Sequence, residues 1–303
     1  MIQIENLHKS FGRVDAVKGI SCSVAKGEVV GLLGPNGAGK TTTMRLITGY
    51  LAPDQGNIVV DGISVLTDSE KTRASIGYLP ENAPLYHDME VIEFLEYVAS
   101  LRQVSDTCRG DRVREVVSLC GLKTVVGRLI GQLSRGFKQR VGLAQAMIHK
   151  PPILILDEPT TGLDPHQIQE IRALIKEVGR ERTVILSSHI MQEVEAVCDR
   201  ALIISRGVLA GEGTLEELTR KKKGGSRYVV RIRGPREEIT RSLPDLAGLS
   251  VEEWHNGTIA LRSPDGGDRG EEIFQWVVRH QWALQELRRE ESSLEEVFLE
   301  LTK

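Results

Sequence analysis

The sequence lacks any apolar run that approaches the roughly 18 residues needed to span a bilayer, so a membrane role would depend on a partner chain. It also lacks a Cys-x-x-Cys pair. Its cysteines are Cys22, Cys108, Cys120 and Cys198, and this scattered spacing predicts reduced thiols in a cytosolic protein without a zinc site. The net charge is only −3, so no global basic field indicates nucleic-acid binding.

The N-terminus lacks a basic region followed by an apolar stretch, so no signal peptide is expected. The chain has 303 residues, which exceeds one average domain and predicts two. An apolar fraction of 40% is sufficient for buried cores.

One stretch carries the most specific pattern in the chain. Its residues are Gly34, Pro35, Asn36, Gly37, Ala38, Gly39, Lys40, Thr41 and Thr42. They fit the phosphate-binding loop Gly-x4-Gly-Lys-Ser/Thr, whose glycines let backbone N–H groups approach phosphate oxygens. Lys40 supplies a positive charge for the β- and γ-phosphates, and Thr41 offers a hydroxyl to Mg²⁺. The alternative is a glycine-rich turn that binds no ligand.

The residues on both sides of this stretch favour the phosphate-loop interpretation. Residues 28–33 form an apolar run of buried-strand length, and residues 42–47 have apolar positions at helical spacing. A strand, a glycine loop and a helix in this order place a phosphate at a helix N-terminus, where the helix dipole favours anions.

Three further polar residues follow predicted buried strands. Asp157 and Glu158 come directly after residues 153–156, and His189 ends the run from residue 183. Nucleotides bind at the carboxyl edge of such strands. We expect Asp157 to hold Mg²⁺, directly or through water, and Glu158 to act as a general base. A neutral His189 can contact the γ-phosphate and hold the water. The alternatives are a strand that ends in surface acids and a structural histidine.

Residues 1 to about 30 alternate like strands, and residues from about 84 to 150 have helical patterns. The helical stretch predicts an insertion into an α/β core. Phe11 is expected with Gly12 in a turn before Ala16, where its ring could stack on an adenine or belong to the core, and position alone does not separate these. Ser134 is expected to cap a helix.

Together these motifs resemble the ATPase subunit of an ATP-binding cassette (ABC) transporter. In order, the motifs are the phosphate loop, Leu133-Ser134-x-Gly136, Asp157-Glu158, Gly162-Leu163-Asp164, and His189. The Leu-Ser-x-Gly signature distinguishes this family from other phosphate-loop hydrolases. The resemblance covers residues 1 to about 220. It is strongest to cassettes of two-component ABC-2 type exporters, including drug-efflux and gliding-motility members.

The resemblance implies an α/β P-loop NTPase cassette with a mixed sheet core, an antiparallel β subdomain and a helical subdomain at about 84–150. It implies a head-to-tail dimer of two copies around ATP, in which Ser134 and Gly136 of one copy contact the ATP of the other. Asp164 would lie at the subunit contact. The dimer would power a separate integral membrane permease, for export. The expected location is cytoplasmic, peripheral on the inner face of the cell membrane through the permease.

Three residues depart from the family pattern. Glu81 stands where the family often has glutamine, so it keeps an oxygen for Mg²⁺ or water but adds charge. Arg135 stands where glycine is common, and Phe137 where glutamine is common. Ser134 and Gly136, the two signature positions that would contact the phosphate, match the family pattern, so ATP hydrolysis is still expected.

Two other functions fit the sequence less well. A soluble mechanical ATPase of the same fold, acting on ribosomes or DNA, is disfavoured because such relatives usually carry two cassettes or long coiled coils, and this chain has one cassette and no sustained heptads. A nucleotide-binding regulator without turnover is disfavoured by the intact Asp157-Glu158 pair.

After residue 220 the pattern changes. Residues 221–226 predict a linker, whose basic run is a solvated hinge or, alternatively, contacts anionic lipid. Residues 227–303 predict the order β-α-β-β-α-β with a hairpin turn at Asn256-Gly257 and a final helix, which indicates a small ferredoxin-like α+β domain. No catalytic constellation lies in it, and regulation or dimer support is the working hypothesis.

Overall fold

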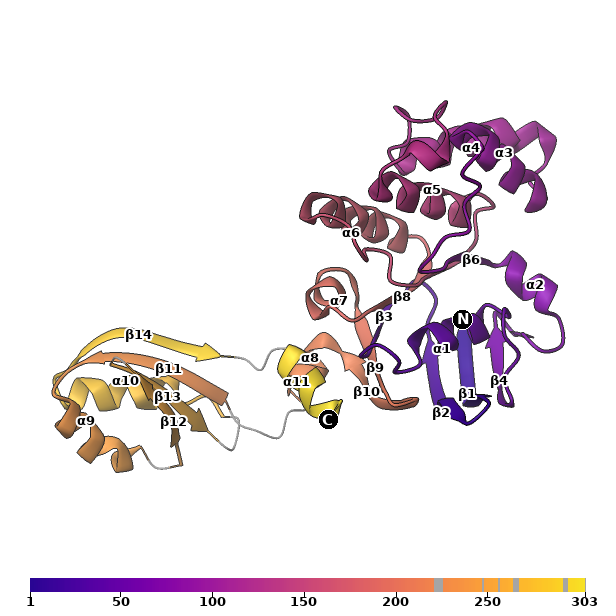
Figure 1. Ribbon diagram of the computed structural model, residues 1–303. Coiled ribbons are helices and arrows are strands. Elements are labelled where there is room, and N and C mark those ends of the chain that lie inside the picture. The colour runs from indigo at the N-terminus through magenta and orange to yellow at the C-terminus, as the bar shows by residue number, and fades with distance from the viewer. Residues whose placement is uncertain (221–225, 247, 256, 264–266, 291–293, 303) are drawn as a thin grey trace. The chain divides into compact units, whose positions relative to one another are not determined.

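The computed structural model describes residues 1–220, 226–246, 248–255, 257–263, 267–290 and 294–302. The chain divides into two compact units (Figure 1). The first holds Met1–Leu215 with the last residues of the chain from Leu301, and the second holds Glu216–Glu300. No helix in the described part of the chain is both long and apolar enough to cross a membrane.

The first unit is built on a six-stranded mixed sheet. In spatial order its strands are β10 (Val208–Thr214), β9 (Arg200–Ser205), β3 (Val29–Leu33), β8 (Thr183–Ser188), β7 (Ile153–Leu156) and β6 (Ile76–Leu79). The last five run parallel, and β10 is antiparallel to β9. Every residue of β3, β7 and β8 is buried, which explains their continuous apolar sequences. The parallel strands therefore bring their carboxyl ends to one edge.

An antiparallel sheet packs beside this core, as the resemblance implied. Its spatial order is β2 (Val14–Val24), β1 (Ile2–Phe11), β4 (Gln55–Val60) and β5 (Ile63–Ser64). Helix α1 (Lys40–Ile47) contacts β2 and β4. One cluster of buried apolar side chains joins both sheets and α1, and it includes Ile4, Met44 and Ile155. This packing fixes the start of α1 against the main sheet.

Helices fill the stretch for which helical patterns were predicted. They are α3 (Val91–Leu101), α4 (Asp106–Leu119), the short 3-10 helix η1 (Ile130–Gln132) and α5 (Arg135–Met147). Figure 1 shows α3, α4 and α5 gathered together. The remaining helices of this unit are α2 (Ser69–Ala74), α6 (Pro165–Gly179) and α7 (Met191–Val197), and α8 (Leu215–Arg220) follows at the boundary. Of these, α7 contacts β3 and β8.

The second unit has the predicted ferredoxin-like topology. Its elements in chain order are β11 (Ser226–Arg233), α9 (Arg236–Ser242), η2 (Leu243–Asp245), β12 (Ser250–His255), β13 (Thr258–Ser263), α10 (Gly270–Arg279) and β14 (Ala283–Glu290), followed by α11 (Leu294–Leu301). The spatial order β12-β13-β11-β14 is antiparallel throughout. Tyr228, Ile259 and Trp276 lie in its core.

Two predicted features of this region fall partly outside the described residues. In the predicted hairpin, Asn256 lies outside them, while β12 and β13 pair antiparallel with His255 opposite Thr258. In the expected linker, residues 221–225 lie outside them, and its last residue, Ser226, is the first residue of β11.

Candidate active site

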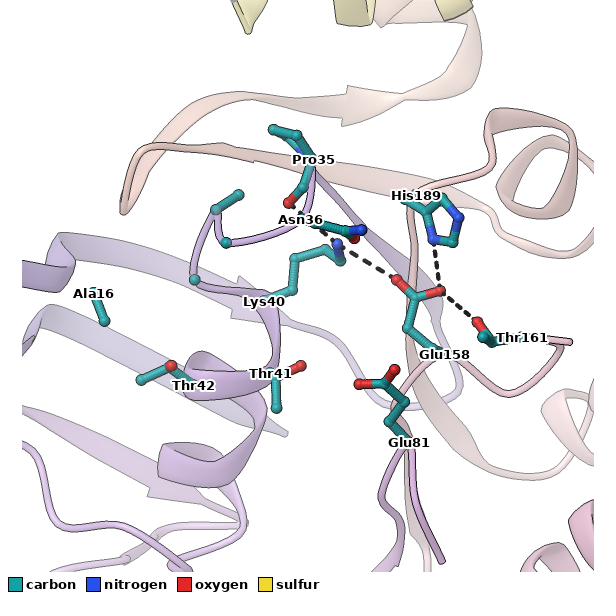
Figure 2. Close-up of a pocket in the computed structure, with 13 residues that line it drawn as sticks. Ala16, Pro35, Asn36, Lys40, Thr41, Thr42, Glu81, Glu158, Thr161 and His189 are labelled. Atoms are coloured by element: carbon teal, nitrogen blue, oxygen red, sulfur yellow. Dashed lines mark hydrogen bonds and ion pairs between the residues drawn. The ribbon is translucent and has the colours of Figure 1, made fainter.

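The phosphate loop connects β3 to α1 and lines a pocket of about 470 Å³ (Figure 2). Residues 35–42 contribute to the lining, together with Glu81, Glu158, Thr161 and His189. Gly39 has a φ of 109°, in the left-handed region, and a Cβ there would lie 2.5 Å from the carbonyl oxygen of Ala16. Only glycine fits this position, so the loop can turn directly into the N-terminus of α1.

Lys40 is the buried cation of this pocket, with 6% of its surface exposed. Its Nζ donates to the Gly34 carbonyl at 2.7 Å and lies 3.4 Å from Glu158 Oε1. The first contact ties the lysine to its own loop, and the second turns it toward the carboxyl end of β7. The loop therefore presents a positive charge at the edge where the acidic residues emerge.

Asp157 is fully buried at the end of β7 and has one oxygen without a partner. Its Oδ1 accepts hydrogen bonds from Ser187 Oγ at 2.7 Å and Thr41 Oγ1 at 3.2 Å. Its Oδ2 has no hydrogen-bond partner among the residues that the structure describes. An orphaned buried carboxylate oxygen is costly unless a cation meets it. A carboxylate beside a hydroxyl is an oxygen set that suits Mg²⁺, so the residues fit this ion.

Glu158 is held in an uncommon backbone conformation, with a φ of 48°. Its N–H donates to Ser187 Oγ at 2.8 Å, and its Oε2 accepts from Thr161 Oγ1 at 3.1 Å and lies 2.9 Å from His189 Nδ1. Because an ionised carboxylate only accepts hydrogen bonds, His189 Nδ1 carries a proton in this contact. Such strained, over-determined residues cluster at functional sites.

Sequence reasoning missed the residues that hold these acids. Ser187 bonds both Asp157 and the backbone of Glu158, and Thr161 bonds the Glu158 carboxylate. A polar signal for Ser187 was present, because hydroxyls end the otherwise apolar run of β8. No comparable local signal marks Thr161 or Ala16, which also lines the pocket.

Of two further predicted site residues, Glu81 lines the phosphate pocket and Phe11 does not. Glu81 follows β6 and lines the pocket, where Figure 2 shows its carboxylate near that of Glu158. Phe11 ends β1 and is not among the residues that line the pocket. It is 49% exposed, with Lys9 Nζ 5.8 Å from its ring centre, so the core alternative for Phe11 is wrong. Adenine stacking stays a prediction.

Gly136 of the signature and Asp164 line a second pocket, of about 480 Å³. Ser134 caps α5, since its Oγ accepts from Phe137 N at 3.4 Å. Asp164 caps α6 by accepting from Gln167 N at 2.9 Å. Neither Ser134, Gly136 nor Asp164 lines the phosphate pocket. The first unit therefore carries two pockets that share none of these residues.

Arg135 also contributes to the surface beside the signature. Its guanidinium lies against Gly162, where an added Cβ would overlap with it. Gly162 has a φ of 73°, so both its backbone and its contact with Arg135 favour glycine. The departure at position 135 is thus accommodated by the loop that precedes Asp164.

Known protein sequences match nearly the whole chain. A family model described as ABC transporter matches residues 17–161. The uncharacterized ABC transporter ATP-binding protein YxlF of Bacillus subtilis (strain 168) is 33% identical over 99% of both chains. The linearmycin resistance ATP-binding protein LnrL of the same organism is 34% identical over 100% of this chain and 98% of that one.

Solved structures resemble about seven tenths of the chain. A structure described as the ATP binding subunit of an ABC transporter has a TM-score of 0.67 and 29% identity, covering 73% of this chain and 92% of that one. The dimeric post-hydrolysis cassette MJ0796, bound to ADP and Pi, has a TM-score of 0.66 and 26% identity, covering 71% and 99%. The chain therefore belongs to the ATP-binding proteins of ABC transporters, and like them it is an ATPase.

Proposed function

We propose that two copies of this chain close head to tail around ATP and power a separate membrane permease of an ABC-2 type exporter. The separation of the two pockets carries the proposal. Ser134 and Gly136 lie outside the pocket formed by the phosphate loop, so a second copy is needed to bring a signature to that pocket. Ser134 at the N-terminus of α5 then meets the γ-phosphate with free N–H groups.

The residues of the phosphate pocket have distinct roles in this proposal. Lys40 exchanges the Glu158 carboxylate for the β- and γ-phosphates. Thr41 and Asp157 hold Mg²⁺, with Glu81 as a further oxygen donor, and the ion neutralises phosphate charge when bound. Glu158 accepts the proton of the attacking water.

His189 completes this arrangement from the end of β8. Its Nδ1 proton is committed to Glu158 Oε2, which sets the direction of the ring. The opposite ring nitrogen carries no proton in the neutral ring, so it accepts a hydrogen bond from the water, and it can donate to a γ-phosphate oxygen only when the ring is protonated. The carboxylate and imidazole thus share one water between them.

The relatives support the transport part of the proposal. They are ATP-binding proteins of ABC transporters, and one is named for linearmycin resistance, which supports export. The first unit would then sit on the cytoplasmic face of the membrane, bound to the permease. The ferredoxin-like unit would act as an accessory domain that regulates or supports the dimer. The relatives do not favour a soluble mechanical ATPase.

Mixing two inactive variants tests the dimer. Lys40→Ala disables the phosphate loop, and Ser134→Arg disables the signature. A mixed dimer retains one intact composite site, so mixing restores part of the ATP turnover that each variant lacks alone. No recovery at any ratio, while both variants remain folded and associate, would contradict the composite site.

A pull-down tests the permease. The tagged chain is captured from detergent-solubilised membranes, and the proteins that accompany it are identified by mass spectrometry. A stoichiometric polytopic membrane protein is the expected result. Ribosomal or DNA-associated proteins without a permease would overturn the transport role and leave the ATPase site unchanged.

A further inference from the structure

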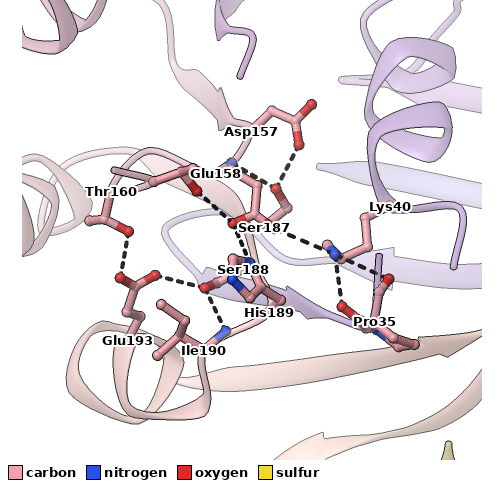
Figure 3. A network of polar contacts seen from close by, with 12 residues as sticks. Pro35, Lys40, Asp157, Glu158, Thr160, Ser187, Ser188, His189, Ile190 and Glu193 are labelled. Carbon is pink, nitrogen blue, oxygen red and sulfur yellow. Dashed lines mark hydrogen bonds and ion pairs between the residues drawn. The ribbon is translucent and has the colours of Figure 1, made fainter. Parts of the chain in front are cut away.

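Glu193 is a buried carboxylate behind the phosphate pocket. It lies on α7, four residues after His189, with only 3% of its surface exposed. Its Oε1 accepts a hydrogen bond from Thr160 Oγ1 at 2.5 Å, and its Oε2 accepts one from Ser188 Oγ at 2.6 Å (Figure 3). Glu193 does not line the pocket itself, so any effect on catalysis passes through its partners.

The two hydroxyls lie close in sequence to the two reacting groups. Thr160 lies two residues after Glu158, in the turn that follows β7. Ser188 ends β8 and directly precedes His189, and its Oγ also accepts from Ile190 N at 3.0 Å. The backbone is therefore fixed on both sides of the histidine. One carboxylate thus ties the turn after β7 to the end of β8, through two residues that are 28 positions apart in sequence.

The chemistry of this position is unusual for a purely structural contact. Within the described residues, no lysine, arginine or histidine forms an ion pair with Glu193. Burying a carboxylate without a cation costs free energy that hydrogen bonds to hydroxyls offset only in part. An apolar side chain would fill the same space at lower cost but could not bond two loops at once.

We propose that Glu193 is a positioning residue for ATP hydrolysis, which fixes the separation between Glu158 and His189. Those two side chains are bonded directly, with 2.9 Å between His189 Nδ1 and Glu158 Oε2, and this contact sets how the carboxylate and the imidazole face the attacking water. The inference rests on the catalytic roles proposed above for Glu158 and His189. It adds to Asp157 and Glu158 an acidic residue on which ATP turnover depends and which lies outside the sequence motifs described above.

The test compares Glu193→Ala with Glu195→Ala in the full chain. Glu195 lies on the same helix and is exposed, so its variant controls for changes in α7. A displacement of about 1 Å at a reacting group costs on the order of 100-fold, so kcat of Glu193→Ala is expected to fall roughly 10- to 100-fold. ATP affinity, measured by titration, stays within about threefold of wild type, because no phosphate contact is removed. Glu193→Gln keeps both bonding points and recovers most of the turnover.

A double-mutant cycle separates positioning from general destabilisation. If Glu193 acts through the histidine, Glu193→Ala lowers turnover much less in a His189→Ala background than in wild type. An equal fall in both backgrounds, or wild-type turnover of Glu193→Ala, overturns the inference. If Glu193→Ala does not fold, Thr160→Val and Ser188→Ala each remove one bond and are tested in the same cycle. Wild-type turnover of His189→Ala alone would instead contradict the proposed catalytic role.

Discussion

Substituting Glu158 by glutamine keeps the shape of the side chain and removes its charge. In the structure the carboxylate lies 3.4 Å from Lys40 Nζ, and both side chains are buried. At an effective dielectric constant of about 20, two unit charges at that distance attract by about 5 kcal/mol, before desolvation is subtracted. Phosphates that approach Lys40 must compete with this attraction. Glu158 is therefore expected to oppose nucleotide binding while it promotes hydrolysis.

Two measurements on Glu158→Gln are expected to move in opposite directions. If roughly a third of the Lys40–Glu158 attraction becomes available as binding free energy for ATP in the variant, ATP affinity rises about tenfold, since 1.4 kcal/mol is a factor of ten. Turnover falls by roughly 10²- to 10⁴-fold, the usual contribution of a general base. Equilibrium titration and single-turnover hydrolysis measure these separately, with Glu195→Gln as the matched control. Turnover near wild type, or lower affinity for ATP, would refute the reasoning.

Three further predictions concern binding and stability. Lys40→Ala is expected to weaken ATP binding itself, and an unchanged Kd would contradict the phosphate-loop assignment. Stacking of a base on an aromatic ring contributes about 1–3 kcal/mol, so Phe11→Ala is expected to lower ATP affinity roughly tenfold. An unchanged ATP titration curve would show that the Phe11 ring does not contact the adenine. Burial, and then the positive charge of Arg102, lower the pKa of His149 to about 4. The unfolded chain binds this proton near pH 6.5 and the folded chain only near pH 4, so stability is lost as pH falls between these values, by about 1–2 kcal/mol after allowance for partial exposure. Urea unfolding at pH 7 and at pH 4.5 measures this effect. Between these two pH values the free energy of unfolding of His149→Gln is expected to fall less than that of wild type, and an equal fall would contradict the assignment of the pH dependence to His149.

Local patterns in the sequence were sufficient for the elements that present the site. The phosphate loop, with its strand and helix, depends on neighbouring residues, and the strand before Asp157 is a plain apolar run. The ferredoxin-like topology was also predictable, because alternation at Tyr228 and the hairpin signal at Gly257 are local.

Contacts between loops could not be predicted in this way. Ser187 supports Asp157 across 30 positions of sequence, and this pairing exists only because β7 and β8 are neighbours in the sheet. The strand order that makes them neighbours is a property of the whole fold. The short helix α7, which carries Glu193, likewise lacks the length that makes periodicity informative.

The ion pair between Lys40 and Glu158 also affects how fast ATP can arrive. The described residues that line the phosphate pocket set one buried lysine against two carboxylates, Glu81 and Glu158. Such a surface has little long-range attraction for a polyanion, so diffusional encounter gains nothing from electrostatic steering. We therefore expect the association rate constant for ATP to change little with ionic strength. Selectivity for the nucleotide is then determined by its dissociation rate constant.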